Sequence, residues 1–238
     1  MSRVKIREYD AKKLLLQNLK QEYKAVLIDI NTNLDALPQQ HPWLLEQKLA
    51  IKPDQLFGKR GKLGLVLLNA DFYAVKKYLK ERLNKEITIE KATDKLTHFL
   101  IEPHVEHQKE YYLCITSERD HDAIHFSEEG GVRVEENWDK VIKIEVPTLQ
   151  EPDLQKINAP EKIIKLIKDI FLLFRKFHFC YLEFNPFTVD ENNNIILLDT
   201  VAQVDSCGIN LPFPKPFGRK FHPEEEHLYF LISKNNQS

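Results

Sequence analysis

Glu183, Asn185 and Asp199 are the residues whose types and spacing best suit metal chemistry. If residues 190–194 form a five-residue loop between antiparallel strands, Asn185 lies directly opposite Asp199, with Cβ atoms about 5 Å apart. Glu183 lies two positions before Asn185 and therefore shares its face of the sheet. Two carboxylates beside an amide oxygen are hard ligands of the kind that Mg²⁺ takes. One interpretation of this spacing is therefore a magnesium-binding hairpin.

The alternative interpretation of this hairpin is a solvent-exposed polar face, because polar and apolar residues commonly alternate on antiparallel strands. Two details argue against it. Leu197 and Leu198 make the return strand apolar up to Asp199, which predicts partial burial of that carboxylate. Pro186 removes a backbone donor beside Asn185, a loss that a binding site explains better than a plain sheet does. Spacing alone leaves both interpretations open.

A second candidate site is basic and rich in glycine. Lys52 and residues 58–64 together hold four cationic side chains and three glycines. Glycines let backbone N–H groups approach an anion closely, and the cations offset phosphate charge. The segment is not a Walker A loop, because no Gly-Lys-Ser/Thr follows the required gap. A basic hairpin tip explains the pattern equally well.

A third candidate is the apolar segment 97–105, which Pro103 interrupts. A strand that ends in Glu102 and Pro103 suits a connector between two lobes, where free backbone groups can hydrogen-bond an adenine edge. The alternative is a plain strand that reaches a turn.

The histidines and cysteines give weaker signals. His104 and His107 are three residues apart, and His121 and His125 are four apart, but neither pair lies on a convincing helix. No cysteine joins them, so the pattern disfavours a zinc site. The three cysteines are far apart and are expected to be small core residues.

The elements that position these residues alternate irregularly along the chain. Apolar periodicity and turn residues predict helices over 9–19, 71–83 and 160–178. They predict strands over 25–30, 49–52, 62–68, 97–105, 111–116, 123–126, 181–189 and 195–199. This mixture lacks the regular βαβα order of a doubly wound fold, so the sequence predicts the α+β class.

Composition places the chain among ordinary soluble globular proteins. It has 238 residues, a net charge of −2 and 42% apolar residues. A balance of charges gives no reason to expect nucleic acid or a membrane as a partner. The N-terminus lacks a signal peptide, and an odd number of scattered cysteines gives no disulfide framework. We therefore expect a cytoplasmic protein.

The candidate segments occur together, and in order, in a known family. The chain resembles the ATP-citrate lyases over residues 9–226, at 41–45, 52–56, 60–66, 99–103, 129–132, 181–186, 216–219 and 223–225. The Glu-Gly-Gly-Val and Glu-x-Asn-Pro elements are shared with the succinyl-CoA synthetase β subunit.

The resemblance implies one ATP-grasp domain over residues 1–238, in which two α/β lobes hold the nucleotide between them. The nucleotide-side lobe would be an insertion at about 22–105. Residues 1–21 and 106–226 would form the second lobe, and 227–238 a divergent tail.

The resemblance also implies site residues. Lys52, Arg60 and Gly61 would contact the phosphates of ATP, Pro103 and Val105 would frame the adenine, Glu110 would bind the ribose, and Asn185 and Asp199 would hold Mg²⁺. The metal pair is the one that the loop count places face to face.

The resemblance implies a reaction as well. In such enzymes the γ-phosphoryl group passes from ATP to a histidine and then to citrate, and coenzyme A captures the acyl group as citryl-CoA. Cleavage gives acetyl-CoA and oxaloacetate. The citrate loops, the coenzyme A domain and the phosphorylated histidine lie beyond the matching region in this family. We therefore expect the chain to be inactive alone, and to need the remaining domains or a complementary subunit in a hetero- or homo-oligomer.

Two alternatives stay open: a synthetase component acting on another acid such as succinate, and a catalytically silent nucleotide-binding or scaffolding module. Departures from the family pattern bear on both. Lys59 stands where the family has an arginine, and lysine lacks the bidentate fork of arginine. Gln203 stands where the family has a lysine, which removes a charge near the expected metal.

Overall fold

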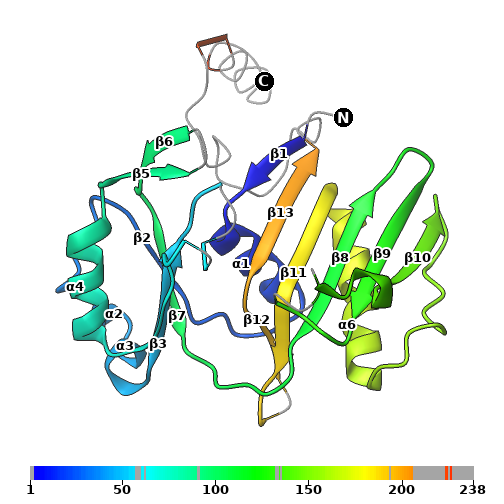
Figure 1. The fold of residues 1–238 in the computed structure, drawn as a ribbon, viewed down its shortest axis with the longest axis horizontal. Helices are drawn as coiled ribbons and strands as arrows, with labels where there is room; N and C mark the ends of the chain where they lie inside the picture. Colours follow the sequence, from blue (N-terminus) through cyan, green and yellow to red (C-terminus); the bar gives the residue numbers. More distant parts are fainter. Residues whose placement is uncertain are drawn as a thin grey trace, which may run out of the picture.

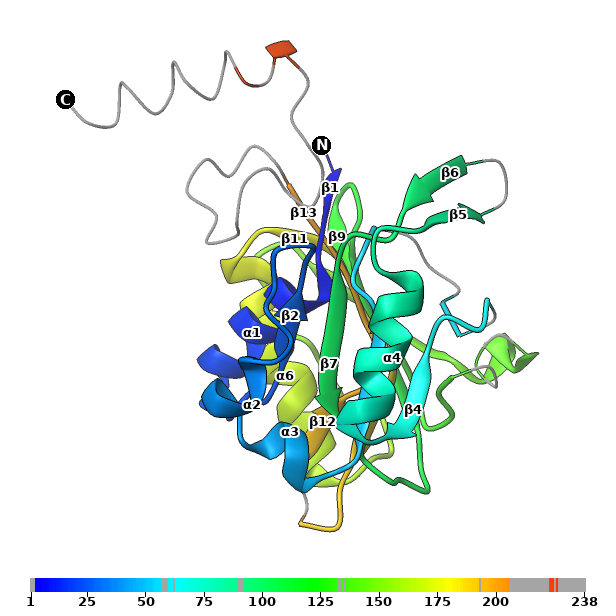
Figure 2. The same cartoon turned by 90° about the vertical axis from the view of Figure 1, so that its left-hand side faces the viewer.

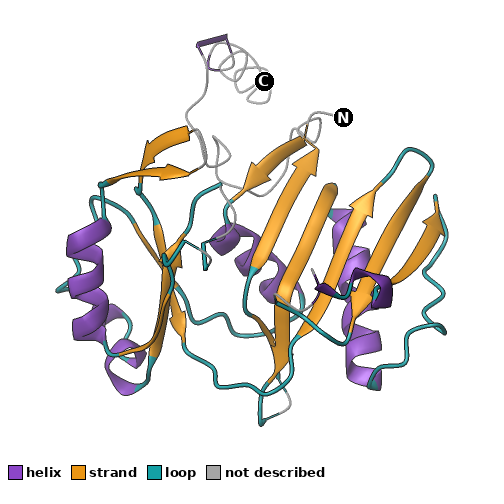
Figure 3. Cartoon of the chain, in the orientation of Figure 1, coloured by secondary structure: helices purple, strands orange, loops and turns teal. Residues whose placement is uncertain are grey.

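Two antiparallel sheets dominate the computed structural model, which describes residues 3–56, 60–61, 63–89, 92–131, 134, 136–192, 194–205, 223–224 and 226 (Figures 1 and 3). The larger sheet has the strand order β1-β13-β11-β8-β9-β10, and β12 pairs with β11. Its strands are β1 (Arg3–Ile6), β8 (Tyr111–Ser117), β9 (His121–Ser127), β10 (Ile142–Pro147), β11 (Phe179–Val189), β12 (Ile195–Leu197) and β13 (Thr200–Asp205).

Helices α1 (Glu8–Asn18) and α6 (Glu161–Lys176) cover one face of the larger sheet (Figures 1 and 2). Helix α6 begins after Pro160, whose ring suits a helix start. Its apolar stripe is fully buried at Ile167 and Ile170 and nearly so at Phe174. This stripe packs with apolar residues of β8 and β11 in the larger core, and its burial fixes the position of the strands that carry Asn185.

The smaller sheet has the order β2-β7-β3-β4, with β2 (Val26–Ile28), β3 (Leu49–Pro53), β4 (Leu67–Ala70) and β7 (Phe99–Pro103). Helix α4 (Phe72–Arg82) packs on it, and short helices α2 (Leu37–Gln40) and α3 (Trp43–Glu46) lie nearby (Figure 2). The hairpin β5 (Glu86–Ile89) and β6 (Ala92–Lys95) and the short helix η1 (Trp138–Lys140) complete the described elements.

Most of the predicted elements are confirmed within a few residues, as is the α+β class. Asp71 caps α4, because its side chain accepts a hydrogen bond from the backbone N–H of Ala74 at 2.8 Å. Strands β1, β5, β6, β10 and β13 were not predicted.

The strand predicted over 62–68 has the wrong bounds. β4 begins only at Leu67, because the preceding residues turn back on themselves. The backbone N–H of Gly64 donates to the carbonyl of Gly61 at 3.0 Å, and that of Leu65 donates to the carbonyl of Arg60 at 3.0 Å. Gly64 has φ +65°, a conformation that glycine adopts without strain. This turn points the chain around Arg60 toward the larger sheet.

Candidate functional site

A buried cluster of charged side chains joins elements of both sheets. The cluster, called here the ion cluster, consists of Glu8 and Lys12 from α1, Lys52 from β3, Arg60 from the turn before β4, Glu102 from β7, and Asp199 from the link between β12 and β13.

Glu8 lies at the centre of the ion cluster. It is 4% exposed, and its carboxylate oxygens lie 2.7 Å from Lys12 Nζ, 2.6 Å from Lys52 Nζ and 2.8 Å from Arg60 Nη2. Burial alone would raise the pKa of Glu8, but the charges of Lys12, Lys52 and Arg60 together lower it. Glu8 is therefore an anion in the folded protein.

Lys52 is held by oxygen atoms on several sides. Its Nζ donates to Glu8 Oε1 and to the carbonyl oxygen of Leu198, each at 2.6 Å, and lies 3.4 Å from Glu102 Oε2. Burial alone would lower the pKa of Lys52, but the charges of Glu8 and Glu102 raise it above its ordinary value. Lys52 therefore remains a cation although its side chain is only 9% exposed.

Arg60 bridges a buried carboxylate and one that faces solvent. Its Nη1 donates to the carbonyl oxygen of Pro53 at 2.9 Å, and its Nη2 contacts both Glu8 and Asp199. The side chain of Asp199 is 40% exposed, whereas that of Glu8 is 2% exposed. The side of Arg60 that contacts Asp199 is therefore the side nearer to solvent.

The predicted register of the hairpin is confirmed. Val189 pairs with Ile195, and Phe184 pairs with Thr200, so Asn185 lies opposite Asp199 between these pairs. The backbone N–H of Asn185 donates to the carbonyl oxygen of Asp199 at 3.2 Å.

The side chain of Asn185 also has a partner. Its Oδ1 accepts a hydrogen bond from the backbone N–H of Gly131 at 2.7 Å. Glu183 lies two residues before Asn185 on β11, opposite Cys114 of β8 and Val201 of β13.

Within the described part of the chain, no group of three or more His, Cys, Asp or Glu side chains could hold a metal. One amide oxygen and one carboxylate still suit Mg²⁺, which commonly completes its shell with water and phosphate.

Residues 104–110 connect β7 of the smaller sheet to β8 of the larger sheet. Pro103 ends β7 opposite Leu49, and the backbone N–H of His104 donates to the carbonyl oxygen of Lys48 at 2.8 Å. The carbonyl oxygen of Val105 lies 2.9 Å from Nδ1 of His107.

Glu110 links this connector to the hairpin. Its Oε1 lies 3.0 Å from His107 Nε2, and its carbonyl oxygen accepts a hydrogen bond from the backbone N–H of Gly130 at 3.0 Å. A Cβ atom added to Gly131 would lie 2.5 Å from Glu110 Oε2. Because Gly131 also donates to Asn185, one chain of contacts runs from the connector to the hairpin.

The structure brings Lys52, Arg60 and Asp199 together in the ion cluster, with Gly61 next to Arg60 in the turn. Asn185 adjoins the cluster through the backbone of Asp199.

Sequence reasoning missed Glu8 and Lys12. The available signal was a charged pair four residues apart on the helix face that also carries Ala11 and Leu15, both of which are fully buried.

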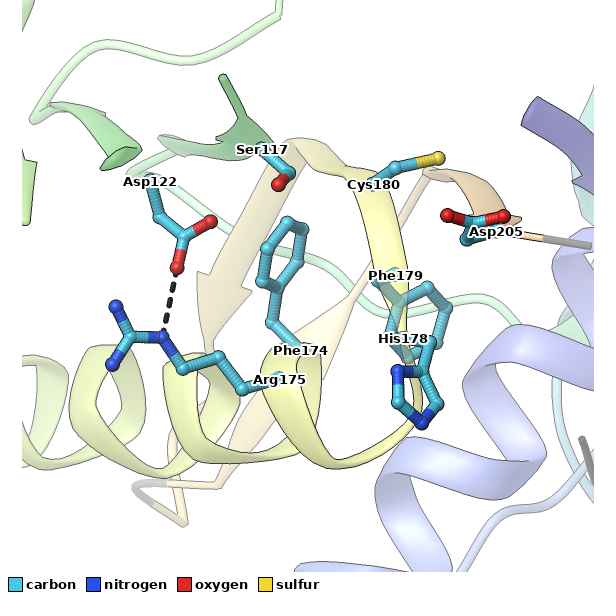
Figure 4. A pocket seen from close by; sticks show the side chains of 8 residues that line it. All are labelled: Ser117, Asp122, Phe174, Arg175, His178, Phe179, Cys180 and Asp205. Carbon is cyan, nitrogen blue, oxygen red and sulfur yellow. Dashed lines mark hydrogen bonds and ion pairs between the residues drawn. The ribbon is translucent and has the colours of Figure 1, made fainter. Parts of the chain in front are cut away.

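The cavity in Figure 4 is a separate feature of about 200 Å³. It is lined by Ser117, Asp122, Phe174, Arg175, His178, Phe179, Cys180 and Asp205. Arg175 Nε donates to Asp122 Oδ2 at 2.8 Å, and its other nitrogens donate to the carbonyl oxygens of Gln150 and Pro147. Burial raises the pKa of the Cys180 thiol, which disfavours a reactive thiolate. Cys180 therefore gives this cavity no activated nucleophile.

Cys114 is likewise buried. Burial and the charge of Glu183 raise the pKa of its thiol to about 12, so Cys114 stays protonated. Both described cysteines are the small core residues that the sequence predicts, while Cys207 lies outside the described residues.

The chain has two antiparallel sheets joined by a connector, and Arg60 on the side of the smaller sheet contacts Asp199 on the side of the larger one. These features are those of an ATP-grasp domain, a fold that implies ATP binding. The chain belongs to the family described as the ATP-citrate synthase ATP-grasp domain, whose model matches residues 2–211.

Similar proteins agree with this assignment. The chain is 40% identical over 261 residues to ATP-citrate synthase alpha chain protein 2 of Oryza sativa subsp. japonica, covering all of this chain and 62% of that one. It is 37% identical over 264 residues to ATP-citrate synthase of Homo sapiens, covering all of this chain and 24% of that one.

Among solved structures, the ATP citrate lyase from Methanothrix soehngenii in complex with citrate and coenzyme A matches with a TM-score of 0.81 and 37% identity. The match covers 98% of this chain and 60% of that one. The chain thus spans about three fifths of the plant alpha chain and of the archaeal chain. No helix in the described ranges is long and apolar enough to cross a membrane.

Proposed function

We propose that this chain binds Mg·ATP between its two sheets and supplies the nucleotide site for the conversion of citrate and coenzyme A to acetyl-CoA and oxaloacetate. The observation that carries this proposal is the ion cluster, in which Arg60 contacts Asp199 and Lys52 donates to the carbonyl oxygen of the neighbouring Leu198. In this proposal residues 22–105 form the nucleotide-side lobe, and residues 1–21 and 106–226 form the second lobe.

Lys52 and Arg60 are the proposed phosphate ligands. Both are cations in a site with little access to water, where a charge-assisted hydrogen bond to phosphate is strong. Arg60 approaches from the turn that contains Gly61, whose missing side chain leaves room for a phosphate oxygen. The expected contribution of the domain to phosphoryl transfer is positioning and neutralisation of charge.

Asn185 and Asp199 are the proposed Mg²⁺ ligands. The metal would supply neutralisation of phosphate charge when it is bound. Asp199 contacts Arg60 in this structure, so a phosphate group that takes over Arg60 leaves the Asp199 carboxylate free for the metal.

Pro103 and Val105 are proposed to frame the adenine, because the connector carries backbone groups beyond the end of β7. Glu110 is proposed to bind the ribose hydroxyl groups, since its carboxylate is 38% exposed and lies on the same connector. The contact of its carboxylate with His107, and the hydrogen bond that its carbonyl oxygen accepts from Gly130, would fix its orientation.

The rest of the reaction is assigned to other parts of the assembly. The plant relatives are named alpha chains, which implies further subunits or parts. We propose that citrate, coenzyme A and the phosphorylated histidine are bound by the remaining domains or by a complementary subunit.

Calorimetry with ATP and with adenosine, each with Mg²⁺, tests the proposal. Arg60→Ala should weaken ATP binding by ~1.5–3 kcal/mol, because a charged partner of phosphate is lost, and should leave adenosine binding unchanged. Arg82→Ala is the matched control, since Arg82 lies over the Tyr78 ring on α4. If Arg60→Ala does not fold, Arg60→Lys takes its place in the experiment, because lysine keeps the positive charge. An equal loss for ATP and adenosine would contradict the proposal.

A further inference from the structure

The two proposed phosphate ligands share one buried partner. Lys52 and Arg60 contact the two carboxylate oxygens of Glu8, Lys52 at Oε1 and Arg60 at Oε2. Each cation also has a second partner, which is the carbonyl oxygen of Leu198 for Lys52 and the carboxylate of Asp199 for Arg60. Asp199 is the partner nearer to solvent, which a phosphate can replace, whereas Glu8 is buried on the other side of Arg60.

The exposure of the carboxylates supports this order. The side chain of Glu8 is 2% exposed, that of Glu102 is 15% exposed and that of Asp199 is 40% exposed. Three cations (Lys12, Lys52 and Arg60) and three carboxylates balance, so the ion cluster has a formal charge of zero. Removal of Glu8 would therefore place an unbalanced positive charge in a site with little water.

Glu8 is itself held in place by the backbone. Asp54, which follows β3 and is 1% exposed, accepts hydrogen bonds from the backbone N–H groups of Glu8 at 2.9 Å and Tyr9 at 3.1 Å. This contact fixes the first turn of α1 against the smaller sheet. Glu8 thus projects from a helix that packs on the larger sheet, and it contacts cations that belong to the smaller sheet.

We propose that Glu8 is a positioning residue that holds Lys52 and Arg60 in the geometry required for the phosphates of ATP. This inference rests on the proposed function. Two effects of Glu8 oppose each other: its negative charge repels phosphate, and its two oxygens fix both cations. Positioning outweighs repulsion here, because the cations would otherwise repel each other.

Calorimetry of the Glu8→Gln variant with Mg·ATP tests whether positioning of the cations or repulsion of phosphate has the larger effect on ATP binding. The variant keeps the length of the side chain but removes the charge, and its amide group cannot accept from all three cations. Positioning predicts at least tenfold weaker ATP binding with adenosine binding unchanged. Repulsion alone predicts tighter ATP binding, and that result would overturn the inference.

The double variant Glu8→Gln/Lys12→Met removes the net-charge effect. It deletes one anion and one cation, so the ion cluster stays neutral and the buried site keeps no unpaired charge from this pair. Positioning predicts that ATP binding still weakens at least tenfold, whereas unchanged ATP binding would overturn the inference. This variant also answers the question if Glu8→Gln alone fails to fold.

Glu22→Gln is the control, because Glu22 has a side chain 77% exposed beside Lys24 on the surface. Its ATP binding should equal that of the unaltered chain. The two proposals fail in different ways. If Arg60→Ala weakens ATP binding and neither Glu8 variant does, only the proposed positioning role of Glu8 is contradicted. If the unaltered chain binds no ATP, the proposed function falls as well.

Discussion

Asn185 and Asp199 lie directly opposite one another, and the backbone N–H of Asn185 donates to the carbonyl oxygen of Asp199 at 3.2 Å. The backbone ladder of the hairpin therefore joins the two residues. Asp199 contacts Arg60 across the two sheets, and Asn185 accepts from Gly131, so each residue ties the hairpin to a different loop.

Asp199→Asn should abolish the effect of Mg²⁺ on ATP binding. The variant loses the carboxylate proposed to hold the metal, and it also releases Arg60 from an ion pair. We therefore expect the affinity for ATP to be the same with Mg²⁺ and with EDTA, and no lower in EDTA than that of the unaltered chain. Calorimetry under both conditions measures this. A variant that keeps the full Mg²⁺ effect would refute the metal assignment.

Gly131→Ala should destabilise the fold and weaken adenosine binding. Gly131 has φ +64°, and an added Cβ would lie 2.5 Å from Glu110 Oε2, so Glu110 must move. Gly64→Ala is the matched control, because Gly64 has φ +65° but no atom within 4 Å of the added Cβ. Both variants should lose about 1 kcal/mol in urea unfolding from backbone strain.

Adenosine affinity separates the two glycine variants. Only Gly131→Ala displaces Glu110, the residue proposed to bind the ribose. Equal adenosine affinity in Gly131→Ala and Gly64→Ala would count against that role of Glu110.

Asp54 should make stability depend on pH. Burial and the charge of Glu8 raise its pKa from 3.8 to about 6, against the backbone N–H of Tyr9 and the charges of Arg60 and Arg7. Between pH 3.8 and about 6, the Asp54 carboxyl group is protonated in the folded chain and ionised in the unfolded chain. The contribution of Asp54 to stability therefore falls as pH rises from 3.8 to about 6, by at most about 3 kcal/mol, and is constant above that.

Urea unfolding of Asp54→Asn between pH 4 and 8 measures this effect. The difference in unfolding free energy between the unaltered chain and the variant should shrink as pH rises through the window and then stay level. Asp35→Asn is the control, because the Asp35 side chain is 86% exposed. A difference that grows with pH would show that the pKa of Asp54 is lowered instead.

Asp71→Ala should cost about 1 kcal/mol of stability, because the side chain of Asp71 caps α4 through the backbone N–H of Ala74. Asp71→Asn should recover most of that loss, since an amide oxygen can accept the same hydrogen bond. Urea midpoints of both variants provide the measurement, and equal midpoints would exclude a capping role.

The sequence was most informative where structure depends on neighbouring residues. A five-residue loop fixes the register of a hairpin, so the sequence alone places Asn185 opposite Asp199. The helix starts predicted near residues 71 and 160 are also local, because they depend on backbone groups within one helical turn. The turn at Gly64 was missed because its apolar neighbours, Leu65 and Val66, have the composition of a strand.

The ion cluster was decided by the tertiary structure. Lys52 is 44 residues from Glu8, and Arg60 is 139 residues from Asp199, so no local spacing connects them. Glu8 and Lys12 look like an ordinary surface pair four residues apart on a helix. Only the packing of α1 between the two sheets buries them, and burial turns a weak surface pair into the partner of the proposed phosphate ligands.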